Sequence, residues 1–308
     1  MLIFSFIWFF SNSERSFSIS ERKIAKITEL EDEINQSESQ YNDITSGTEK
    51  KIVWYAEAKT KTKISVVYIH GFSASRQEVS PLTENIAKAL GANIYLTRLI
   101  GHGRVGDAMG QISVDQMLAD AAEAIDVGEQ IGERVIVIGM STGATLATWL
   151  SVKKKSNSLA ALVLLSPNYG LADPKSKLLL LPAAKYWLPL VEGRTYQFKP
   201  DNEQQAKFWS WKYPTVALIP MMELVDSISG LALETMSVPV LVLYSKEDKV
   251  VDVSKITQQF ERMGSVHKEI DIVRGTEGSQ HHVLAGDILS PGTTSAVETR
   301  IISFINKL

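Results

Sequence analysis

The sequence VIVIGMSTG, residues 135–143, determines how the rest of the chain is arranged. A β-branched run of strand length ends there in Gly-x-Ser-x-Gly, and residues 144–150 then have the composition of a helix. A sharp strand-to-helix turn with serine at its apex exposes the hydroxyl above the carboxyl edge of a sheet. Gly139 and Gly143 let the strand and the helix approach closely, and the helix N-terminus directs N–H groups at the same spot. The stretch therefore predicts that Ser141 is a nucleophile.

Strands and helices alternate along most of the chain. Apolar, β-branched runs predict strands over residues 51–55, 64–69, 92–97, 135–138, 159–165, 238–244 and 268–273. Helical patterns cover residues 81–90, 114–131, 144–150, 253–263 and 295–308, and residues 59–63 are predicted to form a basic hairpin turn. Strands separated by helices favour a mostly parallel sheet with right-handed crossovers. The predicted fold class is therefore α/β, with a central sheet flanked by helices.

The alternation breaks between residues 169 and 236. This stretch contains several prolines, no clear strand and the aromatic cluster FWSWKYP at residues 208–214. We interpret residues 169–236 as a helical cap, or lid, inserted into a core formed by residues 51–168 and 237–308. The apolar residues of such a cap can pack a small subdomain, form a movable lid or a wall that binds an acyl group, or do both at once.

The composition is that of an ordinary globular protein. The 308 residues, of which 44% are hydrophobic and 22% charged, suffice for one large α/β domain with an insertion. A formal net charge of -3 and the lack of a basic patch interleaved with aromatic residues predict no nucleic-acid partner. A cysteine count of 0 excludes disulfides, thiolate metal sites and a cysteine nucleophile. No metal-ligand spacing is present in the sequence, and we expect no cofactor.

Residues 1–50 precede this pattern. Residues 1–10 (MLIFSFIWFF), from Met1 to Phe10, are almost wholly apolar but too few to span a bilayer. A membrane-surface anchor, a signal-peptide remnant and a segment packed on the body are the interpretations, and membrane association or export is favoured over a cytoplasmic location. The spacing of apolar residues predicts an amphipathic helix within residues 18–38 that packs on the main domain. Its N-cap is Ser20 and its stripe is Ile24, Ile27, Leu30 and Ile34.

A serine hydroxyl needs a base to remove its proton and a third group to orient that base. The chain has five histidines. His70 and His102 lie in glycine-containing loops and are expected to shape them, and His267 lies in a predicted solvated turn. His281 and His282 follow the last predicted strand, at the carboxyl edge that also carries the serine. The residues alone leave either of these two as the base.

The predicted acid is Asp248. It follows the strand over residues 238–244 and lies between the serine and the histidine pair along the chain. A carboxylate just beyond a strand end can reach the base. Glu247 and Asp252 are the competitors, but Asp252 begins the next helix and is better suited to be its N-cap.

The oxyanion formed by attack on a carbonyl group requires two preorganised N–H donors. The backbone N–H of Thr142, directly after the serine, is one candidate. The second is expected from the loop that follows the strand over residues 64–69, where the N–H of Phe72 is the candidate.

Together these motifs resemble those of the α/β-hydrolases, and more narrowly the carboxylesterase and monoacylglycerol-lipase-like serine hydrolases. The resemblance covers roughly residues 52–308 and rests on HGFS at 70–73, RLIGHG at 98–103, GMSTG at 139–143, SKEDKVVD at 245–252 and HVLAGD at 282–287. The family's H-V-x-x-x-D context implies that His282, not His281, is the base. Many relatives have Gly-x-Ser-Met-Gly-Gly, so Thr142 adds a hydroxyl beside the nucleophile that either narrows the acyl pocket or contacts substrate.

The resemblance implies a serine esterase that acts on short to medium acyl esters or monoacylglycerols through an acyl-enzyme. Ser141 would attack, His282 would act as base, Asp248 would orient it, and the N–H groups of Phe72 and Thr142 would bind the oxyanion. A thioesterase, amidase, lactonase or acyltransferase could use the same residues. A catalytically silent α/β-hydrolase-fold binding protein is the non-enzyme alternative, and the complete set of candidate residues argues against it.

Overall fold

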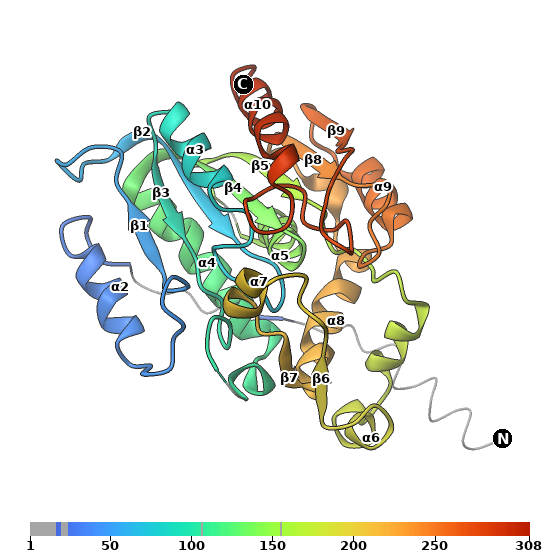
Figure 1. Ribbon diagram of the computed structural model, residues 1–308. Helices are drawn as coiled ribbons and strands as arrows, with labels where there is room; N and C mark the ends of the chain where they lie inside the picture. The colour runs from blue at the N-terminus through green and yellow to red at the C-terminus, as the bar shows by residue number, and fades with distance from the viewer. Residues whose placement is uncertain (1–16, 20–23, 106, 155) are drawn as a thin grey trace.

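The computed structural model describes residues 17–19, 24–105, 107–154 and 156–308. Its centre is a 7-stranded sheet with the strand order β1-β3-β2-β4-β5-β8-β9 (Figure 1). The strands are β1 (Lys51–Val53), β2 (Thr62–Ile69), β3 (Asn93–Leu96), β4 (Gly132–Met140), β5 (Leu159–Leu165), β8 (Val240–Tyr244) and β9 (Lys268–Ile272). In this sheet β1 runs antiparallel to β3 and the other pairs are parallel. The predicted mostly parallel α/β sheet is confirmed.

Helices cover both faces of the sheet (Figure 1). Alternate residues of a strand point to opposite faces. Val67 and Ile69 of β2 accordingly join a core cluster with α4, α5 and α9, whereas Val66 and Tyr68 join a second cluster with α3 and α10. The sheet is thus buried on both sides, as expected for parallel strands. These helices are α3 (Leu82–Ala89), α4 (Val114–Ile131), α5 (Thr142–Lys153), α9 (Val253–Arg262) and α10 (Thr294–Ile305).

The predicted hairpin turn at residues 59–63 is wrong. β1 does not pair with β2. It lies at the edge of the sheet and pairs with β3, where Ile52 is opposite Tyr95. The continuous apolar run of β2 is buried and has neighbours on both sides, β3 and β4. Such a strand belongs in the middle of a parallel sheet, and the connection over residues 54–61 therefore passes β3 to reach β2 and forms no tight hairpin.

Residues 169–236, here called the cap segment, are mostly helical. They contain η2 (Pro174–Leu180), α6 (Ala184–Val191), α7 (Glu203–Phe208), η3 (Thr215–Ala217), α8 (Leu218–Ser227), η4 (Ile228–Gly230) and η5 (Leu233–Thr235). The expectation that this stretch lacks strands is wrong, because β6 (Thr195–Gln197) and β7 (Lys212–Pro214) form an antiparallel pair too short to show a sequence pattern. α8 packs against α4 and α5, and its Leu224 is part of the main core.

The N-terminal helix is shorter than predicted. α2 (Leu30–Glu38) begins with three acidic residues in its first turn, which favours a helix N-terminus at this point. Ile24 and Ile27 precede it, whereas Leu30 and Ile34 are buried in the main core. Ser20 and the apolar residues 1–10 lie outside the described residues. In the described ranges, none of the helices combines the length and apolar character needed to cross a membrane.

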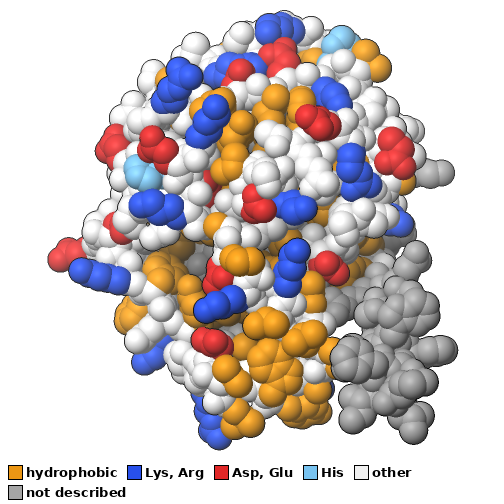
Figure 2. All heavy atoms as spheres, turned by 90° about the vertical axis from the view of Figure 1, so that its right-hand side faces the viewer, with side chains coloured by type: hydrophobic (Ala, Val, Ile, Leu, Met, Phe, Trp, Pro, Cys, Tyr) orange, Lys and Arg blue, Asp and Glu red, His pale blue; other side chains and the backbone are white. Residues whose placement is uncertain are grey.

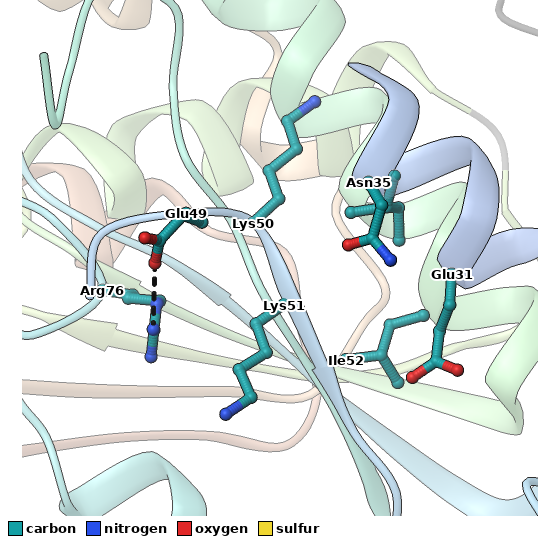
Figure 3. A pocket seen from close by; sticks show the side chains of 8 residues that line it. Glu31, Asn35, Glu49, Lys50, Lys51, Ile52 and Arg76 are labelled. Carbon is teal, nitrogen blue, oxygen red and sulfur yellow. Dashed lines mark ion pairs between the residues drawn. The ribbon is translucent and has the colours of Figure 1, made fainter. Parts of the chain in front are cut away.

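A polar pocket of about 280 Å³ lies where α2 meets β1 (Figure 3). Lys50 and Arg76, two cations of its lining, are already paired, with Glu123 at 2.6 Å and Glu49 at 3.5 Å. None of the predicted site residues lines it. Because these cations are compensated within the protein, we do not place the functional site in this pocket.

Glu38, the last residue of α2, forms a buried ion pair with Arg98 of the RLIGHG loop. Its Oε1 is 2.7 Å from Nη2 and its Oε2 is 2.8 Å from Nε, with the two side chains 10% and 3% exposed. A buried charge that loses its partner stays desolvated, so we expect Glu38→Gln to lower the free energy of unfolding by about 3 kcal/mol. Urea denaturation would measure this change.

The matched control for this prediction is Glu31→Gln. Glu31 pairs with Lys59 on the surface, where the side chains are 36% and 55% exposed. Surface pairs contribute little, and the expected loss is below about 1 kcal/mol. Equal losses in the two variants would show that the pair of Glu38 and Arg98 has no special role in stability.

Candidate active site

Ser141 lies at the turn between β4 and α5, with the backbone angles φ 52 and ψ -114. Serine rarely adopts a positive φ, and the conformation persists only where surrounding contacts hold it. The N–H of Ser141 donates to the carbonyl oxygen of Leu165 at 2.9 Å, and its own carbonyl oxygen accepts from the N–H of Asn168 at 3.2 Å. These bonds hold the strained turn against the end of β5.

Several positions near Ser141 require glycine because neighbouring atoms of the protein leave no room for a Cβ. A Cβ at Gly143 would lie 2.0 Å from the carbonyl oxygen of Ile69, and one at Gly139 would lie 2.7 Å from the nitrogen of Ala144. A Cβ at Gly71 would lie 3.2 Å from the Cβ of Ser141. The loop after β2 is therefore pressed directly against the serine turn.

Phe72 and Thr142 carry the two candidate oxyanion donors. Within the described residues, neither backbone N–H has a hydrogen-bond partner. Thr142 is the first residue of α5, where the helix dipole favours a negative charge. The Oγ1 of Thr142 is buried and also has no hydrogen-bond partner among the residues that the structure describes. The cap segment supports the Phe72 loop through Tyr213, whose ring packs edge-on against Phe72 at 5.7 Å between centroids.

His282 and Asp248 form a hydrogen-bonded pair. Nδ1 of His282 donates to Oδ2 of Asp248 at 2.7 Å, and the Asp248 side chain is 0% exposed. The other oxygen, Oδ1, accepts from the N–H groups of Val250 and Val251 at 2.8 and 3.0 Å. A carboxylate held at both oxygens orients the imidazole and keeps the proton on Nδ1. Nε2 is then the nitrogen that can accept a proton.

The competing residues have other partners. Nδ1 of His281 lies 2.8 Å from the carbonyl oxygen of Thr276 and 3.5 Å from a carboxylate oxygen of Glu247. Asp252 caps α9 as expected, because its Oδ1 accepts from the N–H of Ser254 at 2.9 Å. The structure therefore brings Asp248 to His282 and leaves Glu247 and Asp252 elsewhere.

The other three histidines do not contact Asp248, and two of them pack within buried loops. His70 accepts the N–H of Leu99 on Nε2 at 3.1 Å, and burial lowers its pKa to about 3. His102 lies with its ring centroid 5.2 Å from that of His70, and burial lowers its pKa to about 4. Both are neutral at neutral pH, while His267 is exposed. In the described part of the chain, no group of three or more His, Asp or Glu side chains could hold a metal ion.

Two residues beside the site were missed by sequence reasoning. The Oγ of Ser166, at the end of β5, donates to the carbonyl oxygen of His282 at 2.8 Å. The carboxyl of Glu78 is buried beneath the Phe72 loop, and this burial raises its pKa to about 7. Neither had a usable signal, because a serine or glutamate in a polar loop is usually solvated.

Comparison with known proteins places the chain among hydrolases. Residues 60–285 match the family described as serine aminopeptidase, S33. The thermostable monoacylglycerol lipase of Bacillus sp. (strain H-257) is 26% identical over 248 residues, which are 80% of this chain and 92% of that protein.

Solved structures share the fold. The structure reported for LipS and LipT, two metagenome-derived lipolytic enzymes, has a TM-score of 0.70 and 21% identity, covering 86% of this chain and 100% of its own. The monoacylglycerol lipase of Paleococcus ferrophilus has a TM-score of 0.63 and 16% identity, covering 84% and 98%. The predicted resemblance to esterases and monoacylglycerol lipases with the α/β-hydrolase fold is confirmed. Because the family match spans well over half of its length, the chain belongs to the serine aminopeptidase S33 family.

Proposed function

We propose that this protein is a serine carboxylic-ester hydrolase that cleaves short to medium acyl esters or monoacylglycerols through an acyl-enzyme. The observation that carries the proposal is a strained serine turn accompanied by a buried carboxylate–histidine pair and two backbone N–H groups that have no partner among the described residues. Relatives named as monoacylglycerol lipases support the choice of substrate.

In the proposed mechanism, the Oγ of Ser141 attacks the ester carbonyl while Nε2 of His282 takes its proton. The N–H groups of Phe72 and Thr142 bind the tetrahedral oxyanion, and Asp248 stabilises the imidazolium. Collapse breaks the bond to the alcohol, which leaves with the proton from His282, and the acyl group stays on Ser141. His282 then takes a proton from water, the hydroxide attacks the acyl-enzyme, and the carboxylic acid leaves as Ser141 regains its proton.

The cap segment supports an apolar substrate. Large apolar side chains of η2 and α6 face solvent, including Leu178 at 51%, Tyr186 at 69% and Leu190 at 84% exposed. Figure 2 shows the right-hand side of the molecule in Figure 1, and apolar side chains gather at its lower end, the end at which α6 lies in Figure 1. Exposed apolar patches mark surfaces that meet apolar partners, which favours a lipid-like ester over a peptide.

The proposal is tested with a panel of p-nitrophenyl esters from acetate to palmitate, 1-monoacylglycerols and aminoacyl p-nitroanilides. We expect kcat/KM to be highest for a short to medium acyl chain. The aminoacyl anilides should be slower by about 100-fold or more, because an apolar acyl site leaves a charged amino group unpaired. Faster cleavage of an aminoacyl anilide than of every ester would overturn the proposal in favour of a peptidase, the activity in the family's description.

A further inference from the structure

Glu78 is a buried carboxyl group that the mechanism above does not use. It precedes α3 and is 3% exposed. Its Oε2 accepts hydrogen bonds from the N–H of Gly71 at 2.7 Å and from the hydroxyl of Tyr68 at 3.0 Å. Gly71 directly precedes Phe72, so this bond holds the backbone next to the second oxyanion donor. A Cβ at Gly71 would be 2.8 Å from Oε1 of Glu78, which shows how tightly the loop lies on the carboxyl.

The residues after Glu78 also hold the loop that carries His282. The N–H of Asp287 donates to the carbonyl oxygen of Ser80 at 2.9 Å. A Cβ at Gly286 would lie 3.0 Å from the carbonyl oxygen of Glu78, so the two segments touch through their backbones. Burial raises the pKa of Glu78, and the hydrogen bond from Gly71 and, to a smaller extent, the charge of His282 lower it.

The charge environment of Glu78 contains few groups. His282 acts on it from the histidine loop and Tyr68 from β2, while Glu84 on α3 acts on Tyr68. Asp248 pairs with His282. Among the described residues, no Lys or Arg forms an ion pair with Glu78. An ionised Glu78 therefore gains a nearby cation when His282 becomes protonated.

We propose that Glu78 is a positioning residue, which holds the Gly71–Phe72 backbone at the serine turn and, when ionised, stabilises the protonated His282 that forms during catalysis. This inference rests on the proposed function. Oε2 can accept both of its hydrogen bonds when Oε1 carries a proton. Acidification would therefore remove the charge of Glu78 but leave its hydrogen bonds to Gly71 and Tyr68 in place.

Glu78→Gln removes the charge but keeps the hydrogen bonds to the loop, because the amide oxygen can accept the same two bonds. The readouts are kcat and KM for the best ester and the rate at which a fluorophosphonate labels Ser141, each across the acid-to-neutral range. We expect kcat to fall by about 10-fold with KM changed by less than about 2-fold, and the midpoint of the acid limb to move to lower pH by about 0.5 to 1 unit. The acid limb of the pH profile moves to lower pH because activity of this variant no longer requires an ionised carboxylate at position 78. Glu78→Ala, which also removes these hydrogen bonds, should lower kcat by about 100-fold.

The wild-type protein provides a test that needs no variant. If both His282 and Glu78 must lose a proton, the acid limb of the labelling rate falls more steeply than a single ionisation allows. Glu298→Gln is the matched control, since this half-buried acid of α10 accepts a hydrogen bond from Asn85 at 3.1 Å and is not among the charges that act on Glu78 or Tyr68. It should keep the wild-type profile.

Each outcome decides the inference. A single-proton acid limb in the wild type, or an unchanged limb and kcat in Glu78→Gln, would overturn it. A wild type whose Ser141 is labelled but which cleaves no ester would refute the proposed substrate, and the labelling profile would still test Glu78. A wild type that is not labelled at Ser141 would refute both proposals.

Discussion

Ser141→Ala is expected to lower kcat/KM for p-nitrophenyl ester hydrolysis by at least about 10⁴-fold, because Ser141 is the group that forms the acyl-enzyme in the proposed mechanism. The fold should be unaffected, since alanine removes only the hydroxyl from a turn that is held by backbone hydrogen bonds to Leu165 and Asn168. Initial rates on the best ester would measure the loss. A fluorophosphonate probe followed by peptide mass spectrometry would identify the labelled side chain.

The matched control for the nucleophile is Ser151→Ala. Ser151 lies on α5, the helix that begins after Ser141, and its Oγ donates to the carbonyl oxygen of Thr148 at 2.7 Å. This variant should keep the wild-type rate and remain labelled at Ser141. Undiminished hydrolysis by Ser141→Ala, or labelling of a different serine in the wild type, would contradict the assignment.

His282→Ala is expected to be nearly as damaging as loss of the nucleophile, with kcat reduced by about 10⁴-fold or more. Its ring has the geometry of a base, because Nδ1 is held 2.7 Å from a fully buried carboxylate of Asp248. In the proposed mechanism, removing this ring leaves Ser141 without a proton acceptor. It also leaves the Asp248 charge without its imidazole partner.

His281→Ala is the internal control for this prediction, since the neighbouring residue has the same side chain. The ring of His281 is bonded to Thr276 and not to Asp248, so the expected loss of kcat is below about 10-fold. The same rate assay compares the two variants. An inactive His281→Ala beside an active His282→Ala would reverse the assignment.

Much of the fold could be predicted because its signals are local. The β-branched runs and the helical pattern over residues 114–131 place β2, β4, β5 and α4 close to where the structure has them. The errors fall where the pattern is weak. β6 and β7 are too short for alternation to show. α2 begins at Leu30, with acidic residues in its first turn, although the apolar spacing starts earlier in the chain.

The choice between neighbouring residues of one type is a different problem. His281 and His282 are identical in type, and only the family resemblance separated them in the sequence. In the structure, a backbone turn at His281, with φ 52, gives the two rings different partners. Asp248 lies 34 residues earlier in the chain, so this pairing exists only after β8 and the histidine loop have come together.

The sequence by itself determined the strand–serine–helix turn, the parallel sheet and the order of the candidate residues, because turn geometry and hydrophobic period act between near neighbours. The tertiary structure decided which carboxylates are buried and what they touch. Glu78 lies in a polar stretch, yet it is buried where the loops containing Gly71 and Gly286 close around it. Desolvation by groups distant in sequence cannot be inferred from local composition, and it is this desolvation that changes the ionisation of Glu78.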